Sequence, residues 1–453
     1  MKKRNTYILF ILVVIVLLPV RETRREGTMP WQRESGGVEK PVPVHDMLQN
    51  HYSDLVETRE LDRAVARFMK QWHIVGASLA ITRGGKLVYS KGYGHADREA
   101  GIPVNVNNIF RVASISKLIT AAGIMKLVEE KRLALESVVF GENGILDDTL
   151  FSRPADRRVL NITVEHLLRH QGGFPARHAD PMFNPVEVAR RMNTPPPADL
   201  NTIIRYVLGQ RLGFAPGSSS SYSNVGYGIL TRVIEKVSGQ DYETFTREKI
   251  LVPAGCHDMH LGRNLSADRY HNEVRYYEPE NAGKVPACTG EERQVYRSDG
   301  GNNIEELLGA GGWVASPTEL ARLLLAIDGD PSSPDVLSPE SVESMTRCRA
   351  NALPIGWTRA GEDGEWWRTG TLAGTSAMMK RQGDGVCWVF VTNTSTWAGA
   401  RFPYTIDHVV TRAIDRVEEW PERDLLDPLQ RDAHRAREFL AGESSPAARE
   451  REI

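Results

Sequence analysis

The chain has 453 residues, of which 41% are hydrophobic and 25% are charged, and its formal net charge is −2 at pH 7. These are ordinary values for a globular protein, and the length fits one large domain or two to three smaller ones. Both signs of charge are interspersed, so the sequence has no basic footprint for nucleic acid, and the lack of a fixed-period repeat argues against a solenoid or propeller.

The first twenty residues, MKKRNTYILFILVVIVLLPV, join a basic start to about fourteen apolar residues. At 1.5 Å per residue this run would span roughly 21 Å, which is short of the ~30 Å hydrocarbon core of a membrane. The run fits an export signal, although no small-x-small cleavage site follows it. We therefore predict that residues 1–20 are a signal or, more in keeping with the missing cleavage site, an uncleaved membrane anchor; a buried core helix is the alternative. Residues 21–56 are predicted to form a linker.

The elements that follow can be predicted from local patterns. Apolar residues at helical spacing predict a helix over 57–72, and alternation around a Gly-Gly pair predicts a β-hairpin at about 75–94. A further helix is predicted to open at Ser114 and to run through LITAAGIMKLVEEKRL. From about 140 to 300, helices are expected between loops rich in proline and glycine.

Strand patterns return near the end of the chain. SAMMKRQGDGVCWVFVTN predicts a second hairpin, and a final amphipathic helix is expected near 403–419. Strands near both ends with helices between them predict an α/β plus α fold, in which the two ends build one antiparallel sheet and a mostly helical region is inserted. The domain would cover 57–418, with the insertion at about 140–300 and a charged tail at 419–453.

Ser114 and Lys117 lie together in FRVASISKLITAAGI, where a polar approach becomes an apolar run. A serine at a helix start is most often an N-cap. Lys117 follows one turn later, so its amine can lie beside the serine hydroxyl. The chain has no other Ser-x-x-Lys, but about one match is expected by chance in a chain of this length. The spacing alone therefore leaves a cap and a nucleophile both open.

Nucleophilic chemistry would require an unusual lysine. An unperturbed lysine titrates near pH ~10.4, so at pH 7 only about one in 2,500 is a free base. Lowering its pKa to about 8 would make roughly one in ten available, and both burial and a helix N-terminus act in that direction. A nearby tyrosine could share the proton. Such a site would also need a tyrosine held by polar neighbours, a strand offering backbone donors, and a cation.

A Tyr-x-Asn sequence supplies the tyrosine. SYSNVGYGIL carries Tyr222 and Asn224 directly before an apolar, helix-like run. The other Tyr-x-Asn, at residues 270–272, lies in a charged stretch with no helix after it, and we set it aside. Tyr222 and Asn224 are therefore the predicted partners of Lys117.

WWRTGTLAGTSAMM supplies the strand and the cation, with Arg368 just before the late hairpin. Gly370 would let the backbone come close to a ligand. The N–H of Thr371 could then join that of Ser114 as a donor to an oxyanion. We accordingly predict that Arg368, Gly370 and Thr371 contribute to substrate binding.

The order Ser-x-x-Lys, Tyr-x-Asn and basic-x-Gly resembles the serine β-lactamase and penicillin-binding family, and most of all the class C β-lactamases, D-Ala-D-Ala carboxypeptidases and related esterases. The connecting segments ITVEHLLRHQGGFP, PGSSSSYSNVGYGILTRVIEKVSG and GAGGWVASPTELARLLL also resemble that family. The resemblance covers about 57–418. It implies a β-lactamase/transpeptidase-like fold and an exported serine hydrolase that cleaves an amide, ester or β-lactam. A small-molecule or peptide acyl donor would be the substrate, with no cofactor and no metal.

The resemblance also implies a role for each motif residue. Ser114 would form the acyl-enzyme, while Lys117 and Tyr222 together would take its proton and pass it to the leaving group. Asn224 would bond the acyl side of the substrate and help to orient Lys117. The N–H groups of Ser114 and Thr371 would form the oxyanion hole, in which losing one donor typically costs about a hundred- to a thousandfold in rate.

Arg368 departs from the family, which usually has lysine or histidine at this position. Arginine does not give up a proton at working pH, so it cannot shuttle one. Arg368 could hold a substrate carboxylate or shape the field around Tyr222. It could also simply flank a core strand and face solvent.

Other candidate sites are weaker. His166 and His170 have the i, i+4 spacing of a helical zinc pair, but Leu167 occupies the place of the glutamate that a zinc peptidase needs. We expect these histidines to be buried or to anchor a loop. The chain has no Gly-x-Ser-x-Gly, which argues against an α/β-hydrolase. Its cysteines form no CxxC pair, and two interpretations remain open, two disulfides or four buried free thiols: Cys256, Cys288, Cys348 and Cys387.

Three classes of function remain. The first is the serine hydrolase. The second is a catalytically silent sensor on the same fold that binds peptide or penicillin. Intact Ser114, Lys117 and Tyr222 argue against it, whereas the unusual Arg368 keeps it open. The third is a structural protein held in a membrane complex by its N-terminal anchor and its charged C-terminal tail, for which the sequence offers little support.

Overall fold

The computed structural model describes residues 48–174, 180–427 and 430. A seven-stranded antiparallel sheet lies at its centre, in the order β3-β2-β1-β12-β11-β10-β9. The strands are β1 Gly76–Arg83, β2 Lys86–Asp97, β3 Ile102–Pro103, β9 Arg359–Ala360, β10 Trp366–Leu372, β11 Thr375–Arg381 and β12 Cys387–Thr392. The predicted segments 1–20 and most of 419–453 lie outside the described residues, so those predictions stay predictions.

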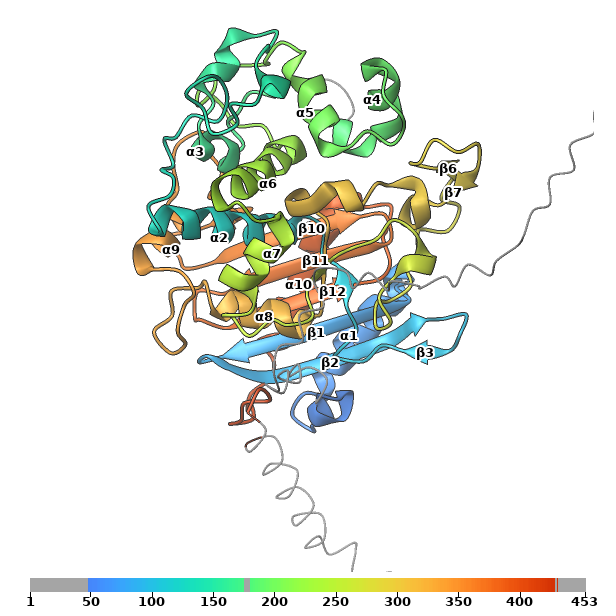
Figure 1. The fold of residues 1–453 in the computed structure, drawn as a ribbon. Coiled ribbons are helices and arrows are strands. Elements are labelled where there is room, and N and C mark those ends of the chain that lie inside the picture. The colour runs from blue at the N-terminus through green and yellow to red at the C-terminus, as the bar shows by residue number, and fades with distance from the viewer. Residues whose placement is uncertain (1–47, 175–179, 428–429, 431–453) are drawn as a thin grey trace, which may run out of the picture. The chain divides into compact units, whose positions relative to one another are not determined.

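The pairing of β1 with β12 joins the two ends of the chain into one sheet (Figure 1). Ala77 lies opposite Thr392 and Thr82 lies opposite Cys387 in an unbroken antiparallel register. Both predicted hairpins are present, as β1–β2 and as β11–β12. The predicted architecture, a sheet built from both chain ends with a mostly helical insertion, is confirmed.

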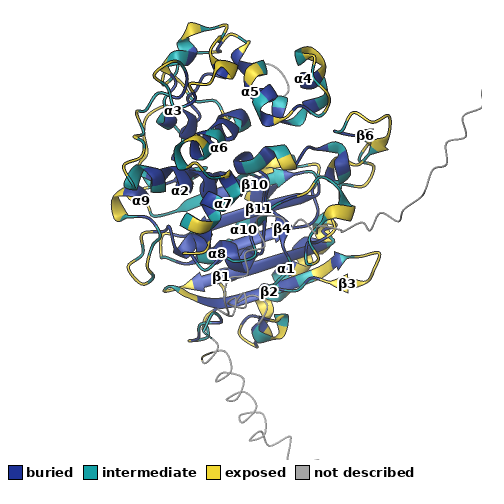
Figure 2. Ribbon diagram, in the orientation of Figure 1, coloured by how far each residue is buried: buried dark blue, intermediate teal, exposed yellow. Residues whose placement is uncertain are grey.

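Helices cover both faces of the sheet, in a three-layer arrangement. Alternate residues of one strand point to opposite faces, so Leu79 packs with α1 and α10 while Ala80 packs with the central helices. Figure 2 shows the resulting buried band through the sheet and its flanking helices. The helices are α1 Arg59–Trp72, α2 Ser116–Glu129, α3 Val164–Leu168, α4 Pro185–Met192, α5 Leu200–Leu208, α6 Asn224–Ser238, α7 Tyr242–Thr246, α8 Pro317–Leu325, α9 Pro339–Thr346 and α10 Phe402–Ile414.

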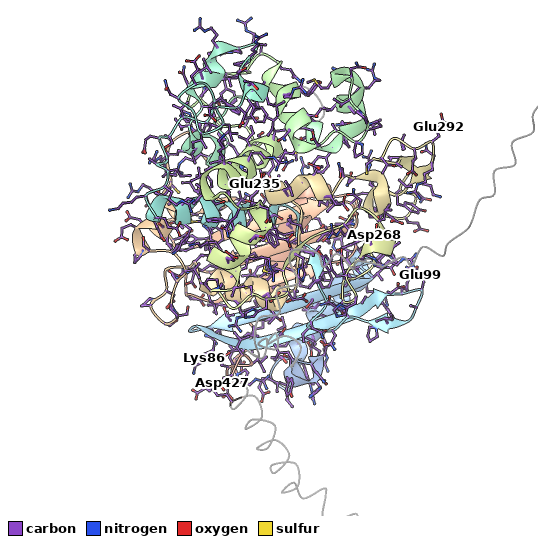
Figure 3. All side chains as sticks on the ribbon, viewed as in Figure 1. Lys86, Glu99, Glu235, Asp268, Glu292 and Asp427 are labelled. Atoms are coloured by element: carbon purple, nitrogen blue, oxygen red, sulfur yellow. The ribbon has the colours of Figure 1, made fainter. Side chains whose placement is uncertain are left out.

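Short strands that the sequence did not predict lie within the inserted region and on either side of it. Two- and three-residue strands form beside the helices and within the long loop before α8: β4 Phe110–Arg111, β5 His260–Leu261, β6 Val285–Pro286, β7 Gln294–Val295 and β8 Trp313–Ala315. Such short segments carry too few residues for alternation to show in the sequence. In Figure 3, the labelled Glu99 and Glu292 lie at the outer edge of the fold.

Part of the predicted linker 21–56 packs on the sheet. The turn Asn50–Ser53 is joined to it by two side chains. Asn50 Nδ2 donates to the Val104 carbonyl at 2.8 Å, and Ser53 Oγ donates to the Ser90 carbonyl at 2.8 Å. The hydrogen bond of Ser53 is buried, so this segment belongs to the packed structure.

Two further findings bear on the sequence predictions. Across the described ranges, no helix combines the length and the apolar character needed to span a membrane. All four cysteines lie in the described part of the chain and are free thiols, with Cys256, Cys288 and Cys387 buried and Cys348 exposed. The structure therefore agrees with free thiols, but the expectation that all four are buried is wrong for Cys348.

Candidate active site

Ser114 lies in a tight turn, Ala113–Ile115, immediately before α2. Neither this turn nor α2 has a side-chain N-cap, so Ser114 does not cap the helix. The preceding Ala113 has φ 49°, in the left-handed region that residues with a Cβ seldom adopt. Strain of this kind is often stored where a side chain must be presented to a site. Because Ser114 does not cap the helix, its hydroxyl is available to other partners.

Lys117 is wholly buried on α2, a helix that is itself enclosed on nearly all sides. Its Nζ lies 3.2 Å from Ser114 Oγ and 2.6 Å from Asn224 Oδ1, and it also contacts the Ala310 carbonyl oxygen. Three acceptors match the three donors of an ammonium group. The contact with Ser114 is the longer of the two measured distances, and it is the one across which a proton can be exchanged.

Tyr222 reaches the same hydroxyl from the start of α6. Its OH donates to Ser114 Oγ at 2.7 Å. Between Tyr222 and Asn224, Ser223 is the N-cap of α6 and accepts from the Gly226 N–H at 3.1 Å. The middle residue of the Tyr-x-Asn motif thus fixes the helix start, so that its two neighbours are both presented to Lys117.

Asn224 is oriented by Asp180, a residue that no sequence motif marks. Asn224 Nδ2 donates to Asp180 Oδ2 at 2.7 Å. A carboxylate only accepts, so Asp180 requires the amide nitrogen on its side and leaves the oxygen toward Lys117. The predicted orienting role of Asn224 is therefore matched by the geometry, whereas its contact with substrate stays a prediction.

Arg368 on β10 is turned inward and is only 1% exposed, so the alternative in which it faces solvent is wrong. Its Nε donates to the Ser114 carbonyl at 2.7 Å, and its Nη2 donates to the Tyr222 hydroxyl at 3.0 Å. One guanidinium therefore holds both the backbone of Ser114 and the hydroxyl of Tyr222. A substrate contact through Arg368 is not tested by this arrangement.

Gly370 lets β10 pass close to Ser114. A Cβ at this position would lie 2.2 Å from the Val112 carbonyl oxygen and 3.2 Å from the Ser114 nitrogen. Thr371 follows it and lines the same cavity as Ser114. The close approach predicted for Gly370 is present, and the Thr371 N–H remains the predicted second oxyanion donor.

The pKa values of Lys117 and Tyr222, the two side chains that face the Ser114 hydroxyl, are both lowered toward neutral pH. Burial lowers the pKa of Lys117 to about 8, with help from the charge of Arg368 and against the influence of Tyr222. Tyr222 as a residue is 47% exposed, and the partial desolvation of its hydroxyl would by itself raise its pKa, but the charges of Lys117 and Arg368 outweigh this and lower that pKa to about 8. Two groups so close titrate as a pair, which shares the proton between them.

His170 packs against this pair. Its ring stacks on Tyr222 with centroids 4.5 Å apart, and its Nδ1 accepts from the Ser223 N–H at 3.1 Å. Burial, together with the charges of Arg368 and Lys117, holds the pKa of His170 well below its usual value. His170 is therefore a neutral ring that supports Tyr222, a place that its sequence context did not predict.

The two histidines considered as a helical zinc pair do not lie on one helix. α3 ends before His170, whose φ of 58° turns it away from the helical path, and His166 closes a capping box with Thr163. The expectation that these histidines anchor local structure is confirmed. In the chain as described, no three His, Cys, Asp or Glu residues gather as a metal cage.

A cavity of about 310 Å³ opens over Ser114. Its walls come from the turn before α2, from β10 and from the segments around Phe183, Leu307 and Tyr404. Among the described residues that line the cavity, Arg368 is the one that carries a charge. An apolar pocket with a few convergent polar groups is the usual form of a small-molecule site.

Comparison with known sequences places this arrangement in a family. The family profile described as Beta-lactamase matches residues 61–409. The chain belongs to the Beta-lactamase family. The resemblance inferred from the three motifs is thereby confirmed, and the domain belongs to a fold family of serine hydrolases that includes esterases and amidases.

Relatives of this Beta-lactamase family member carry several names. It is 23% identical over 368 residues to Protein flp of Staphylococcus aureus strain N315, covering 79% of this chain and 66% of that protein. It is 29% identical over 201 residues to Esterase EstB of Burkholderia gladioli, covering 44% of this chain and 50% of EstB. The chain thus spans less than two thirds of the length of either relative.

Solved structures support the fold. The octameric penicillin-binding protein homologue of Pyrococcus abyssi is 23% identical with a TM-score of 0.59, and the match covers 80% of this chain and 79% of that one. The D-amino acid amidase of Ochrobactrum anthropi SV3 is 21% identical with a TM-score of 0.60, covering 80% and 97%. At these identities the likeness establishes the fold alone.

Proposed function

We propose that this protein is an exported serine hydrolase that cleaves an ester, amide or β-lactam through an acyl-enzyme on Ser114. The observation that supports the proposal best is the convergence of two groups on one hydroxyl. Tyr222 OH lies 2.7 Å and Lys117 Nζ 3.2 Å from Ser114 Oγ, and the pKa of each is lowered to about 8. Such values suit general bases that operate near neutral pH.

The reaction then follows in two halves. The Lys117–Tyr222 pair, with one proton removed, accepts the proton of Ser114 as Oγ bonds to the substrate carbonyl carbon. The carbonyl oxygen becomes an oxyanion at the N–H groups of Ser114 and Thr371. As the bond to the leaving group breaks, the pair returns its proton to that group and leaves an ester on Ser114. Water, deprotonated by the same pair, hydrolyses this ester and regenerates the hydroxyl.

The silent sensor is the second candidate for the same site. It would use the cavity over Ser114 to hold a peptide or penicillin without turnover. The two lowered pKa values argue against it, because a binding site gains nothing from a lysine whose charge is weakened by burial. Export, through residues 1–20 as a signal or membrane anchor, is part of our proposal and rests on the sequence alone.

Intact-mass spectrometry tests the proposal directly. The purified protein and its Ser114→Ala variant are treated with a fluorophosphonate, a chromogenic cephalosporin and a short-chain nitrophenyl ester. We expect an adduct on the wild type that maps to Ser114 and is absent from the variant. The lifetime of the adduct then separates a hydrolase from a penicillin binder. A folded wild type that gives no adduct with any of the three reagents would favour the silent sensor.

A further inference from the structure

A second, open groove continues from the cavity over Ser114. It has a volume of about 680 Å³ and shares a wall with that cavity, built from Phe183, Thr371, Leu372 and Ala400. Tyr222 lines the cavity but not the groove. In the proposed reaction the leaving group takes its proton from the Lys117–Tyr222 pair, so it lies on the Tyr222 side of Ser114. The arm of the substrate that passes Thr371 into the groove is then the acyl arm.

Two cations border the groove at the base of the β6–β7 hairpin, which Figure 1 shows at the edge of the fold. Lys284 comes directly before β6 and Arg297 follows shortly after β7, and the pairing of Val285 with Val295 brings both to the same end of the hairpin. Lys284 Nζ lies 5.5 Å from the centre of the Tyr296 ring. Within the described ranges neither cation forms an ion pair with a carboxylate. Both positive charges are therefore available to a ligand.

The remaining polar groups of the groove favour an anion as well. Glu278 is the one acid among the described lining residues, and its Oε1 already accepts from the N–H and the hydroxyl of Ser298, both at 2.8 Å. Asn302 also lines the groove and is only 5% exposed, yet in the described part of the chain its side-chain amide has no hydrogen-bond partner. A buried amide is stabilised when a ligand bonds to it. A carboxylate could accept from this amide and pair with the two cations.

Much of the rest of the groove lining is apolar. Leu372 and Ala373 continue the wall from the end of β10. Trp397, from the loop before α10, also lines the groove and is 73% exposed. A large aromatic side chain left in water is typical of a contact surface. A hydrocarbon chain between the reacting carbonyl and the carboxylate would cover these side chains.

We propose that this groove is an acyl-arm subsite for acyl groups that end in a carboxylate. Arg297 and Lys284 supply the charge, the Asn302 amide donates a further hydrogen bond, and Trp397 and Leu372 pack along the hydrocarbon chain. The proposal rests on the proposed function, because the groove can select an acyl group only if Ser114 accepts one. It assigns this specificity to the β6–β7 hairpin and the loop before α10, outside the three motifs.

Two 4-nitrophenyl esters of one dicarboxylic acid test the charge preference. The mono(4-nitrophenyl) ester of suberic acid ends in a carboxylate, and its methyl ester has the same chain without the charge. We expect kcat/KM to be about tenfold higher for the carboxylate ester. Because both cations are exposed, this preference should shrink as sodium chloride is added. A wild-type ratio of one or below would overturn the subsite.

Charge variants locate the preference. Arg297→Gln and Lys284→Gln should each lower the ratio of the two kcat/KM values at least about twofold, and Arg297→Glu should bring it to about one or below. Arg293→Gln is the matched control, because Arg293 lies in the same hairpin, pairs with Glu291 and is not part of the groove lining. The control should keep the wild-type ratio. A ratio that survives in both glutamine variants, or that falls equally in Arg293→Gln, would contradict the assignment.

Fluorophosphonate labelling separates failure of the subsite from failure of the proposed function. If Ser114 is labelled while the carboxylate ester is turned over no faster than its methyl ester, the hydrolase proposal stands and the subsite is wrong. If Ser114 is not labelled in protein that circular dichroism shows to be folded, the proposed function fails and the subsite fails with it.

Discussion

The rate of Ser114 modification should follow the ionisation of the Lys117–Tyr222 pair. The acylation step needs the pair to have lost one proton, so the rate rises with pH and levels off above the controlling pKa. Burial lowers the pKa of Lys117 from its ordinary value of 10.5 to about 8. This difference corresponds to about 3 kcal/mol in favour of the neutral amine.

The expected profile can be worked out from that value. With a pKa of about 8, roughly one site in a hundred is active at pH 6, one in eleven at pH 7 and ten in eleven at pH 9. The rate should therefore rise about ninetyfold from pH 6 to 9 and flatten between 8 and 9. An ordinary lysine would instead give a rise of about a thousandfold over the same range with no plateau.

Fluorophosphonate labelling is the suitable assay because it reports the attack of Ser114 and requires no deacylation. The second-order rate constant is measured by intact mass from pH 6 to 10, and Ser114→Ala corrects for labelling elsewhere. Stability of the fold across this range is followed by circular dichroism. A flat profile, or one that still rises tenfold per unit at pH 9, would refute the assignment of Lys117 and Tyr222 as the base.

Further outcomes can be checked with point variants or a reductant. Tyr222→Phe should lower kcat/KM about a hundred- to ten-thousandfold, the usual range for a general acid–base, while denaturant melts show an intact fold. Gly370→Ala places a Cβ 2.2 Å from the Val112 carbonyl and should cost at least about a hundredfold in kcat, whereas Gly283→Ala meets nothing within 4 Å and should be neutral in the same assay. Asp180→Ala removes the charged partner of Asn224 and should lower kcat/KM about tenfold, in line with the worth of such a hydrogen bond; an unchanged value would show that Asn224 needs no orienting partner. With all four cysteines free, dithiothreitol should leave the melting temperature unchanged, and a drop would reveal a disulfide.

Local periodicity by itself determined much of the secondary structure of this protein. The alternation of β1–β2 and of β11–β12 and the apolar spacing of α1 are properties of short segments, so they can be read from neighbouring residues. The spacing of Ser114 and Lys117 on one helical turn is equally local. The order of the three motifs then predicted membership of the serine β-lactamase and penicillin-binding family, and the family match confirms it.

Tertiary packing decided what those residues do. Whether Ser114 caps a helix or attacks a substrate depends on Tyr222, which lies 108 positions away and reaches it only because α6 packs beside α2. Asp180 and His170 lie in segments whose local patterns indicate loops and turns, so their contacts with the motif residues could not be foreseen.

Arg368 shows the same division most clearly. Its sequence context permitted a solvent-facing residue, a carboxylate clamp or a partner of Tyr222. Burial beneath the cavity and two hydrogen bonds place it on Ser114 and Tyr222. A long, charged side chain bonds to the acceptors that lie within about 3 Å of it. Which acceptors these are depends on the whole fold and not on the neighbouring sequence.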